Sequence, residues 1–225
     1  MLRELVATLA SLIPAIESGG LAVAHAHPPV MPERTRFENA PPITVAYSDL
    51  GRALTSHLIV RAREETTTVH STFTAAVIIA INKISPGWFG DTLGILHLVS
   101  YRKLMDKGDC FELLAGMQIS QYPLNSRQRF WELAKIVHTS LENARTPGVL
   151  DVEMQLISNL GVVPANSHYG DLKLKAVYGS MVLPDHHNVQ SFGITMLNDS
   201  LTMTLTSRWH VECLLYAVKE VLQQA

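Results

Sequence analysis

Cysteine, charge and long apolar runs are all scarce in this 225-residue sequence. Its two cysteines, Cys110 and Cys213, form neither a Cys-x-x-Cys pair nor a zinc-ligand spacing, so they provide no disulfide framework and no zinc module. We expect both to be ordinary core residues, because free cysteine is among the most buried residue types. The apolar stretches at residues 1–13 and 69–84 are too short to cross a bilayer, so we expect no membrane span.

Charged residues make up only 17% of the chain, and the formal net charge is −2. Both signs are scattered, without the basic run that binds nucleic acid or an anionic membrane surface. Hydrophobic residues reach 47%, which excludes disorder for most of the chain and is enough for a sizeable core, in one large domain or two small ones. We therefore expect a globular cytoplasmic protein with no nucleic-acid partner.

The motifs of several common enzyme classes are also missing. The chain has no Gly-x-Gly-x-x-Gly, no P-loop and no Gly-x-Ser-x-Gly, which leaves dehydrogenase, kinase and serine-hydrolase interpretations without support. Its histidines show no i, i+4 pair or glutamate partner of the kind that zinc sites use. The histidines considered are His25, His27, His168, His186, His187 and His210. We expect neither a metal nor a bound cofactor.

The stretch around which the rest of the chain is organised runs from Asp151 to Arg208. Residues 154–163 are apolar, short and broken by Asn159 and Gly161, as is typical of a buried strand that runs into a tight turn. Three further segments alternate as half-buried strands do, namely residues 172–181, 189–196 and 201–207. Residues 198–200, with the sequence Asn-Asp-Ser, predict a hairpin loop between the last two.

Helical spacing of apolar residues predicts several helices around these strands. They are residues 2–13, a helix from Ser48 to Glu65, a buried helix from Val69 to Ile84 with Thr67 or Thr68 as its cap, residues 127–144 with Ser126 as cap, and a last helix capped by Ser207. Strands are predicted at residues 92–98 and 111–120. Residues 19–46 contain Gly-Gly and several prolines, the composition of an extended linker. Strands separated by helices, with no internal repeat, indicate an α/β layered domain.

Three stretches carry a resemblance to a known superfamily. They are Ile157-Ser-Asn-Leu-Gly161, Thr67-Thr-Val-His-Ser-Thr-Phe-Thr-Ala-Ala76 and Val99-Ser-Tyr-Arg102. In order and spacing they resemble the C-terminal half of the condensation-domain and chloramphenicol-acetyltransferase-like superfamily, and within it phthiocerol dimycocerosyl transferase-like and alcohol O-acetyltransferase enzymes. The resemblance covers nearly the whole chain. It implies a chloramphenicol-acetyltransferase-like layered fold, a mixed sheet with flanking helices, as one half of a two-half enzyme.

The resemblance also implies a domain organisation. Residues 1–18 would be a detached helix that belongs to a preceding half, and residues 19–46 the Pro-rich crossover linker between the halves. Residues 47–225 would then form a C-terminal acyltransferase-like half-domain.

The superfamily's catalytic motif is His-His-x-x-x-Asp-Gly, in which the second histidine acts as general base. The nearest string in this chain starts at His186-His187, and it has Ser191 in place of the Asp and Phe192 in place of the Gly. Ser191 cannot supply the carboxylate that holds the proton and tautomer of a general base. His187 is therefore a candidate base with a plain alternative, that it is a polar residue in an exposed turn.

The resemblance assigns four residues to the wall of a substrate channel. Arg102 matches the arginine of a strand that faces the channel, and Ser158, Asn159 and Gly161 match the turn that lines the acyl-donor tunnel. Each has a structural alternative, which is a surface or salt-bridged role for the arginine and a backbone-holding role for the turn residues. His70 is interpreted as a hydrogen-bonded core histidine.

From the resemblance we expect half of an acyltransferase, which moves an acyl group from a thioester of coenzyme A or a carrier protein to an alcohol or amine. The catalytic motif would come from another segment or chain, so the expected partner is a second half-domain or, in a homo-oligomer, another copy of this chain. Two alternatives stay open. One is a self-contained trimeric-type acetyltransferase that uses His187, and the other is a non-catalytic partner-binding module.

Overall fold

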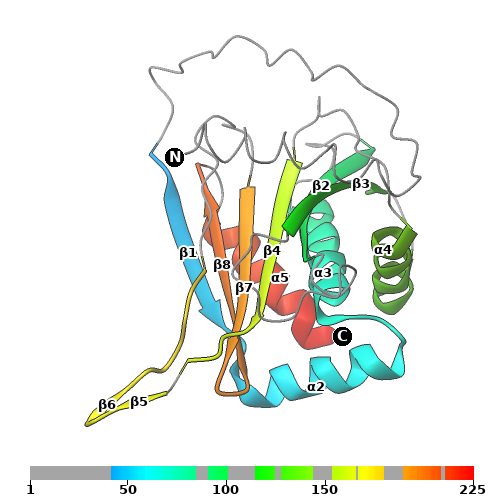
Figure 1. Ribbon diagram of the computed structural model, residues 1–225. Coiled ribbons are helices and arrows are strands. Elements are labelled where there is room, and N and C mark those ends of the chain that lie inside the picture. Colours follow the sequence, from blue (N-terminus) through cyan, green and yellow to red (C-terminus); the bar gives the residue numbers. More distant parts are fainter. Residues whose placement is uncertain are drawn as a thin grey trace, which may run out of the picture. The chain divides into compact units, whose positions relative to one another are not determined.

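A six-stranded mixed β-sheet forms the centre of the computed structural model. The structure describes residues 42–84, 91–100, 115–124, 128–143, 154–165, 167–179, 190–208 and 211–225. All of them belong to one compact unit, residues 37–225. Helices flank the sheet, which confirms the mixed α/β architecture expected from the sequence (Figure 1). No helix in these ranges combines the length and the apolar character needed to span a membrane.

The sheet contains both parallel and antiparallel neighbours. Its strands are ordered β1-β8-β7-β4-β2-β3, and β5 and β6 form a separate two-stranded ladder. β2, β4 and β7 are parallel neighbours, whereas β1, β3 and β8 run antiparallel to their partners. The described strands are β1 (Thr44–Asp49), β2 (Thr92–Ser100), β3 (Ala115–Pro123), β4 (Met154–Val162), β5 (His168–Tyr169), β6 (Leu172–Lys173), β7 (Gln190–Leu197) and β8 (Ser200–Ser207). The described helices are α2 (Gly51–Glu64), α3 (Val69–Ile84), α4 (Phe130–Asn143) and α5 (Val211–Gln224).

Helix α3 is the interior helix of the fold. Thr68 caps it, as the sequence predicts, because its Oγ1 accepts a hydrogen bond from the backbone N–H of Ser71 at 3.2 Å. Most side chains of α3 are buried, and α4 and α5 pack directly against it. Phe73 meets Phe192 of β7 in a T-shaped contact with 5.7 Å between ring centroids, which fixes α3 on the sheet.

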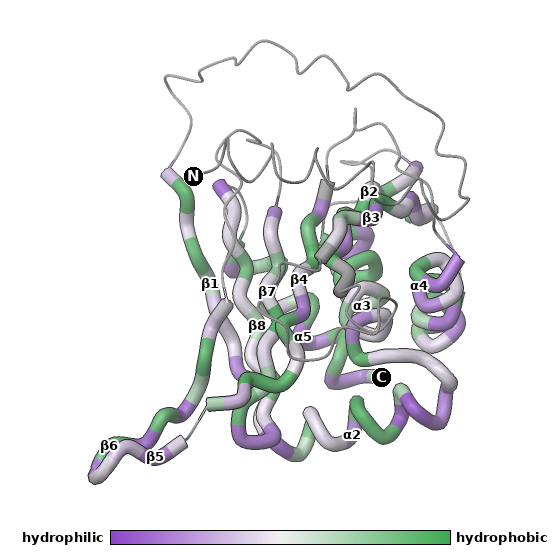
Figure 2. The backbone as a smooth tube through the Cα atoms, viewed as in Figure 1, coloured by the Kyte–Doolittle hydropathy of each residue, from purple (hydrophilic) through white to green (hydrophobic). Residues whose placement is uncertain are grey.

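Alternation along the strands gives the sheet two unlike faces. On β8, Met203 and Leu205 belong to the hydrophobic core, and we call the face on which they lie the inner face. Thr204 and Thr206 lie on the opposite side, which we call the outer face. Helix α4 also has two unlike sides. Its hydrophobic residues face α3, and its hydrophilic residues face away from α3 (Figure 2). The core therefore lies between the inner face and the helices.

The sequence patterns place two helix starts too early. Ser48 and Ser207 are strand residues of β1 and β8 and not helix caps, and the helices begin instead at Gly51 and Val211. Both serines lie in the paired region of β1 and β8, where Ser48 is opposite Met203 and Ser207 is opposite Thr44. Pairing between distant strands thus overrides the local capping preference of serine.

Asp49 organises the start of α2 in place of Ser48. Its Oδ1 accepts a hydrogen bond from the backbone N–H of Gly51 at 2.6 Å and another from the hydroxyl of Ser200 at 2.5 Å. Lys219 of α5 donates to the backbone carbonyl of Asp49 at 2.7 Å. Three elements, β1, the β7–β8 hairpin and α5, are therefore tied together at one residue.

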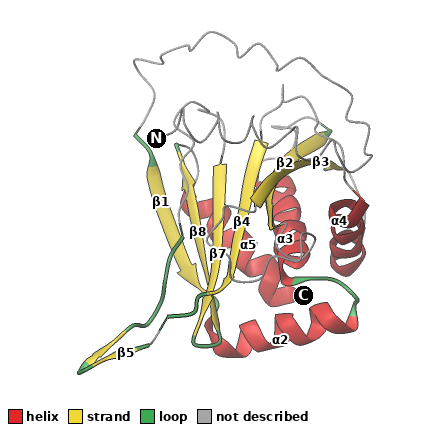
Figure 3. Cartoon of the chain, in the orientation of Figure 1, coloured by secondary structure: helices red, strands yellow, loops and turns green. Residues whose placement is uncertain are grey.

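The expected strand at residues 172–181 is wrong over most of its length. Only Leu172–Lys173 form a strand, which pairs with His168–Tyr169 in a short hairpin that projects from the sheet (Figure 3). Residues 174–179 follow it as a loop over the outer face. A sequence that alternates like a strand has here become a covering segment.

Side chains of the sheet hold this covering segment in place. The carbonyl of Val177 accepts hydrogen bonds from the hydroxyls of Thr195 and Thr202, the second at 2.6 Å. The carbonyl of Gly179 lies directly over Gly193, in the space that a Cβ at position 193 would fill. Residues 174–179 are thus held on the sheet by threonine hydroxyls and by a close backbone contact, and not by the backbone hydrogen bonds of a strand.

Other expectations stand as follows. The hairpin between β7 and β8 is confirmed, because Asn198 and Asp199 have φ values of 51° and 60°, as a two-residue turn with positive φ at both positions requires. Residues 44–46, whose composition suggested a linker, are part of β1. The expected helix at residues 2–13, the cap Ser126 and Cys110 lie outside the described residues. The expectation that Cys213 is a core residue is wrong, because Cys213 is exposed on α5.

We predict that Gly193→Ala lowers the free energy of unfolding by roughly 3 kcal/mol, because the new methyl group must push the 174–179 segment off the sheet. Gly170→Ala is the matched control. Nothing lies within 4 Å of its added Cβ, so only its φ of +61° opposes the change, at a cost of about 1 kcal/mol. Urea titration measures both, and equal losses in the two variants would contradict the close approach.

Candidate functional site

Three of the residues that the resemblance links to function, Ser158, Asn159 and Gly161, lie toward the carboxyl end of β4, one of three neighbouring parallel strands. β7, β4 and β2 lie side by side in this order and run the same way. In open α/β sheets, ligands bind outside the carboxyl ends of such strands. Ser158, Asn159 and Gly161 lie within the second half of β4, and β2 ends at Ser100, two residues before Arg102 in the sequence. This edge of the sheet is the candidate site.

The sequence predicts a turn after the strand, but the structure has an irregularity inside β4 here, which we call the Asn159–Gly161 turn, and a local hydrogen bond shapes it. Asn159 Oδ1 accepts a hydrogen bond from the backbone N–H of Gly161 at 2.8 Å. Gly161 has a φ of +69°, which glycine adopts without strain. The pairing of β4 with β7 shifts at this point, and Leu160 is left exposed while Ser158 is buried. Asn159 and Gly161 therefore have a backbone-shaping role.

A chain of three hydrogen-bonded side chains lies on the inner face beside this turn. Nε2 of His70, in the first turn of α3, is 2.9 Å from Nδ1 of His97 on β2. The other ring nitrogen of His97 lies 3.4 Å from the hydroxyl of Tyr122 on β3. His97 pairs in register with Ile157, two residues before Asn159. We call these three residues the His-His-Tyr chain.

Both imidazoles are neutral near pH 7. His97 is fully buried and His70 is half-buried at the start of α3. Burial disfavours the charged form, and it lowers the pKa of His70 to about 4 and that of His97 to about 3. The neighbouring His70 lowers the pKa of His97 further. A neutral imidazole has one N–H and one lone pair, so each ring can donate one hydrogen bond and accept one.

Beyond Tyr122, the His-His-Tyr chain leads into a cluster of polar side chains between β3 and α4. Ser140 donates to the hydroxyl of Ser120 at 3.2 Å, and the side-chain amide of Gln118 donates to the Ser140 carbonyl at 3.2 Å. Burial raises the pKa of the Tyr122 phenol, so it keeps its proton. Buried polar groups are costly unless they are hydrogen-bonded, and this cluster supplies the partners.

The geometry of the two histidines fits hydrogen bonding and not a shared metal ion. Two nitrogens that ligate one tetrahedral zinc ion at about 2.1 Å lie roughly 3.4 Å apart. The separation found here is 2.9 Å, the length of an N–H···N hydrogen bond. Within the described ranges, no group of three or more His, Cys, Asp or Glu side chains could hold a metal.

The structure places some of the expected site residues and not others. Arg102 and His187 lie outside the described residues, so their assigned roles stay predictions. His70 is the hydrogen-bonded core histidine that the sequence indicated. The sequence analysis did not identify His97 and Tyr122 as site residues. His97 could have been noticed, because a histidine among the inward-facing residues of an apolar strand needs a buried hydrogen-bond partner.

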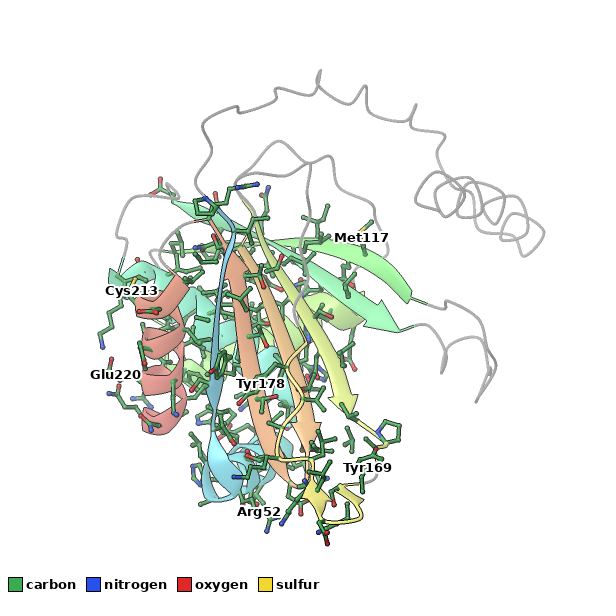
Figure 4. The ribbon with its side chains drawn as sticks, turned by 90° about the vertical axis from the view of Figure 1, so that its left-hand side faces the viewer. Arg52, Met117, Tyr169, Tyr178, Cys213 and Glu220 are labelled. Atoms are coloured by element: carbon green, nitrogen blue, oxygen red, sulfur yellow. The ribbon has the colours of Figure 1, made fainter. Side chains whose placement is uncertain are left out.

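The outer face carries exposed apolar side chains along its margins. Val45 and Tyr47 on the edge strand β1 are 52% and 66% exposed, and Met117 on the other edge strand, β3, is 66% exposed. Tyr178 of the covering segment packs on Tyr47 with 4.8 Å between ring centroids. Met117 and Tyr169 lie on the side of the sheet away from α5 (Figure 4). Val45 and Tyr47 lie on one edge of the sheet and Met117 on the opposite edge, so this face has two separate exposed apolar areas.

Comparison with known proteins gives structural matches alone. No family model and no curated protein matches the sequence. Polyketide synthase associated protein 5 from Mycobacterium tuberculosis matches with a TM-score of 0.63 at 14% identity, over 90% of this chain and 54% of that one. The condensation domain from Monacolin K polyketide synthase matches with 0.63 at 12% identity, over 86% and 49%. Trichothecene 15-O-acetyltransferase from Fusarium sporotrichioides matches with 0.59 at 10% identity, over 81% and 47%.

This is the condensation-domain fold. At such low identity the likeness establishes the fold alone, and it confirms the chloramphenicol-acetyltransferase-like layers that the resemblance implied. The structural neighbours of this condensation-domain fold are condensation domains and chloramphenicol-acetyltransferase-like acyltransferases. The chain spans about half the length of each of the three.

We predict that acid weakens the fold over a defined pH window. In the unfolded chain both histidines titrate near 6.5, whereas the folded protein keeps them neutral down to about pH 4. The unfolded state therefore binds more protons between these values, so the free energy of unfolding falls as the pH is lowered through the window and levels off below it. A pKa lowered from 6.5 to about 4 corresponds to on the order of 3 kcal/mol for one imidazole.

Urea titrations between about pH 7.5 and about pH 4 measure this slope. We expect His97→Gln to flatten it, because the most deeply buried titrating group is gone. His57→Gln, at an exposed position of α2, should leave it unchanged. A slope that survives in His97→Gln would assign the acid sensitivity to other groups.

Replacement of Asn159 tests the turn. We predict that Asn159→Ala lowers stability by about 1 kcal/mol, because the Gly161 N–H loses its acceptor. Asn159→Asp keeps a side-chain oxygen in the same place and should remain close to wild type. Thermal unfolding of both variants measures the difference, and a fully stable Asn159→Ala would remove the hydrogen bond from the account of the turn.

Proposed function

We propose that this chain is one half of an acyltransferase that moves an acyl group from a thioester, of coenzyme A or a carrier protein, to an alcohol or amine. The observation that carries the proposal is the extent of the structural match. The condensation-domain fold covers most of this chain but only about half of each neighbour, and a condensation domain and an O-acetyltransferase are among those neighbours.

In this proposal the second half carries His-His-x-x-x-Asp-Gly and supplies the general base. The base takes a proton from the acceptor, whose oxygen or nitrogen attacks the thioester carbonyl, and the carbon–sulfur bond breaks to release the thiol. The described histidines of the candidate site are poorly suited to that task. His70 and His97 bond to each other, and pKa values of about 4 and about 3 make them weak bases near pH 7.

This half would contribute the channel wall. Ser158, Asn159 and Gly161 lie toward the carboxyl end of β4, beside β2, and Arg102 follows β2 by two residues in the sequence, which supports this part of the proposal. The hydrogen bond from Gly161 to Asn159 gives this edge a defined backbone shape, which is what a wall for an extended substrate needs.

The outer face would be the docking surface for the second half. Its exposed margins include Val45 and Tyr47 on β1, Met117 on β3 and Leu160 on β4. None of these four side chains is charged, whereas the exposed residues of α2 include arginines and glutamates. Aromatic residues of an interface commonly contribute much of the binding free energy, and Tyr47 is the aromatic residue among these four.

Isolation of the native protein through a tag on this chain tests the proposal. We expect the chain alone to show no thiol release from acetyl-coenzyme A with alcohol or amine acceptors. The native complex should release thiol, contain a segment with His-His-x-x-x-Asp-Gly, and keep its activity when His187→Ala is introduced. Ordinary turnover by the chain alone, abolished by His187→Ala, would instead establish the self-contained acetyltransferase.

A pair of surface variants tests the docking face. Tyr47 and Tyr216 are similarly exposed, at 66% and 69%, but Tyr216 lies on α5, on the other side of the sheet. We predict that Tyr47→Thr weakens binding of the second half by roughly tenfold or more, the effect of removing an aromatic hot spot. Tyr216→Thr should bind like wild type. Equal affinities of the two variants, measured by titration calorimetry, would place the interface elsewhere.

A further inference from the structure

Strand β1 is an edge strand, and no described strand pairs with its open side. On the other side it pairs with β8, and the backbone N–H of Leu50 continues this ladder to the carbonyl of Leu201 at 2.9 Å. Backbone groups alternate in direction along an antiparallel strand, so the even-numbered residues of β1 bond to β8. The N–H and C=O groups of Val45 and Tyr47 therefore point to the open side.

The usual protections of an open edge do not occur along this stretch. Natural edge strands are commonly blocked by a lysine, a proline or a β-bulge. β1 contains none of the three from Thr44 to Ser48, and its register with β8 is regular. Lys219 of α5 blocks only the carboxyl end of β1, where it donates to the carbonyl of Asp49 at 2.7 Å. The unprotected backbone is thus the stretch centred on Ala46.

Exposed tyrosines flank the open edge on both sides of the sheet (Figure 4). On the outer face, Tyr47 is 66% exposed and lies against Tyr178, which is 42% exposed. On the helix side, Tyr216 is 69% exposed and lies one turn of α5 before Lys219, which reaches β1. With about 200 Å² for a whole aromatic side chain, the three tyrosines expose on the order of 350 Å². A standard interface buries about 800 Å² per partner, so the tyrosines and the strand edge together fit a weak dimer.

We propose that β1 is the interface of a homodimer, in which the β1 strands of two copies pair antiparallel about a two-fold axis at Ala46. In this register Val45 of one copy lies opposite Tyr47 of the other, and the symmetry repeats the pair. Both residues turn their N–H and C=O groups toward the other copy, and a β-branched side chain opposite an aromatic one stabilises a sheet. The dimer rests on β1 and α5, and it is independent of the proposed acyl transfer.

The charges around the edge fit a second copy of the same chain. Like charges placed directly opposite each other destabilise a strand pair, but residues 43–48 carry no charged side chain. The first charged residue is Asp49, and the symmetry sets its two copies at opposite ends of the paired strands. Its carboxylate also has partners within its own chain, the N–H of Gly51 and the hydroxyl of Ser200. Self-pairing of β1 therefore meets no electrostatic penalty.

A single cysteine at the axis tests both the dimer and its register. In the proposed pairing Ala46 faces the same residue of the other copy at a Cα separation of about 4.5 Å, which a disulfide spans. We expect Ala46→Cys to form a covalent dimer when the complete chain is mildly oxidised, with the linked peptides identified by mass spectrometry. Thr44→Cys is the matched control on the same face of β1. Its two Cα atoms would lie about 13 Å apart along the strands, too far for a disulfide.

Sedimentation equilibrium of the unmodified chain measures the dimer directly, and we expect a Kd in the micromolar range. Val45→Pro removes an N–H that faces the other copy and leaves the β8 ladder intact, so it should weaken the dimer roughly tenfold or more. Val45→Thr keeps that N–H and should match wild type, whereas Tyr216→Thr should weaken the dimer without affecting the second half. Circular dichroism checks that each variant is folded.

Two results would overturn the homodimer. One is a chain that stays monomeric at about 100 μM, well above a micromolar Kd, or that forms assemblies larger than a dimer. The other is equal cross-linking of Ala46→Cys and Thr44→Cys, or no cross-linking of either. Neither result bears on the proposed function, because thiol release by the native complex is measured separately.

Discussion

The need to cover one helix on every side governs this fold. α3 is buried nearly all round from Ser71 to Ile81, and its apolar side chains there cannot face water without cost. The inward-facing side chains of the sheet cover one side of α3, and the apolar sides of α4 and α5 cover the others. The amphipathic patterns of those neighbours are the complement of α3. In the first turn a histidine, His70, enters the interior and requires a hydrogen-bond partner.

The sequence predicted those parts of the fold that local physics decides. α3 and α4 follow from periodicity and the cap at Thr68, and the β7–β8 turn follows from Asn198 and Asp199, which tolerate positive φ. The failures lie where distant segments compete for the same backbone. Ser48 and Ser207 have the chemistry of helix caps, but the β1–β8 ladder takes them. Residues 174–179 alternate like a strand and bind instead through the carbonyl of Val177.

The candidate site divides in the same way. Asn159 and Gly161 indicated a break in the strand pattern, because both residue types tolerate positive φ, but the break is an irregularity inside β4 and not the turn after it. The His-His-Tyr chain was not, since its members come from α3, β2 and β3 and meet only after the parallel and antiparallel pairings of β2 are made. Sequence periodicity gives the direction of each side chain but not the partner it faces. Only the polarity of His97 in an apolar strand indicated that a partner was needed.

The pairing of β1 with β8 has a consequence for how the protein is made. Thr44 and Ser207, which bond across this ladder, are 163 positions apart. A ribosome that adds about 5–20 residues per second needs roughly ten to thirty seconds to cover such a distance. During that time β1 has no described strand to pair with, and its backbone groups and apolar side chains remain open to other chains. The synthesis of β8 therefore decides when the side of β1 that faces β8 is protected from pairing with other chains.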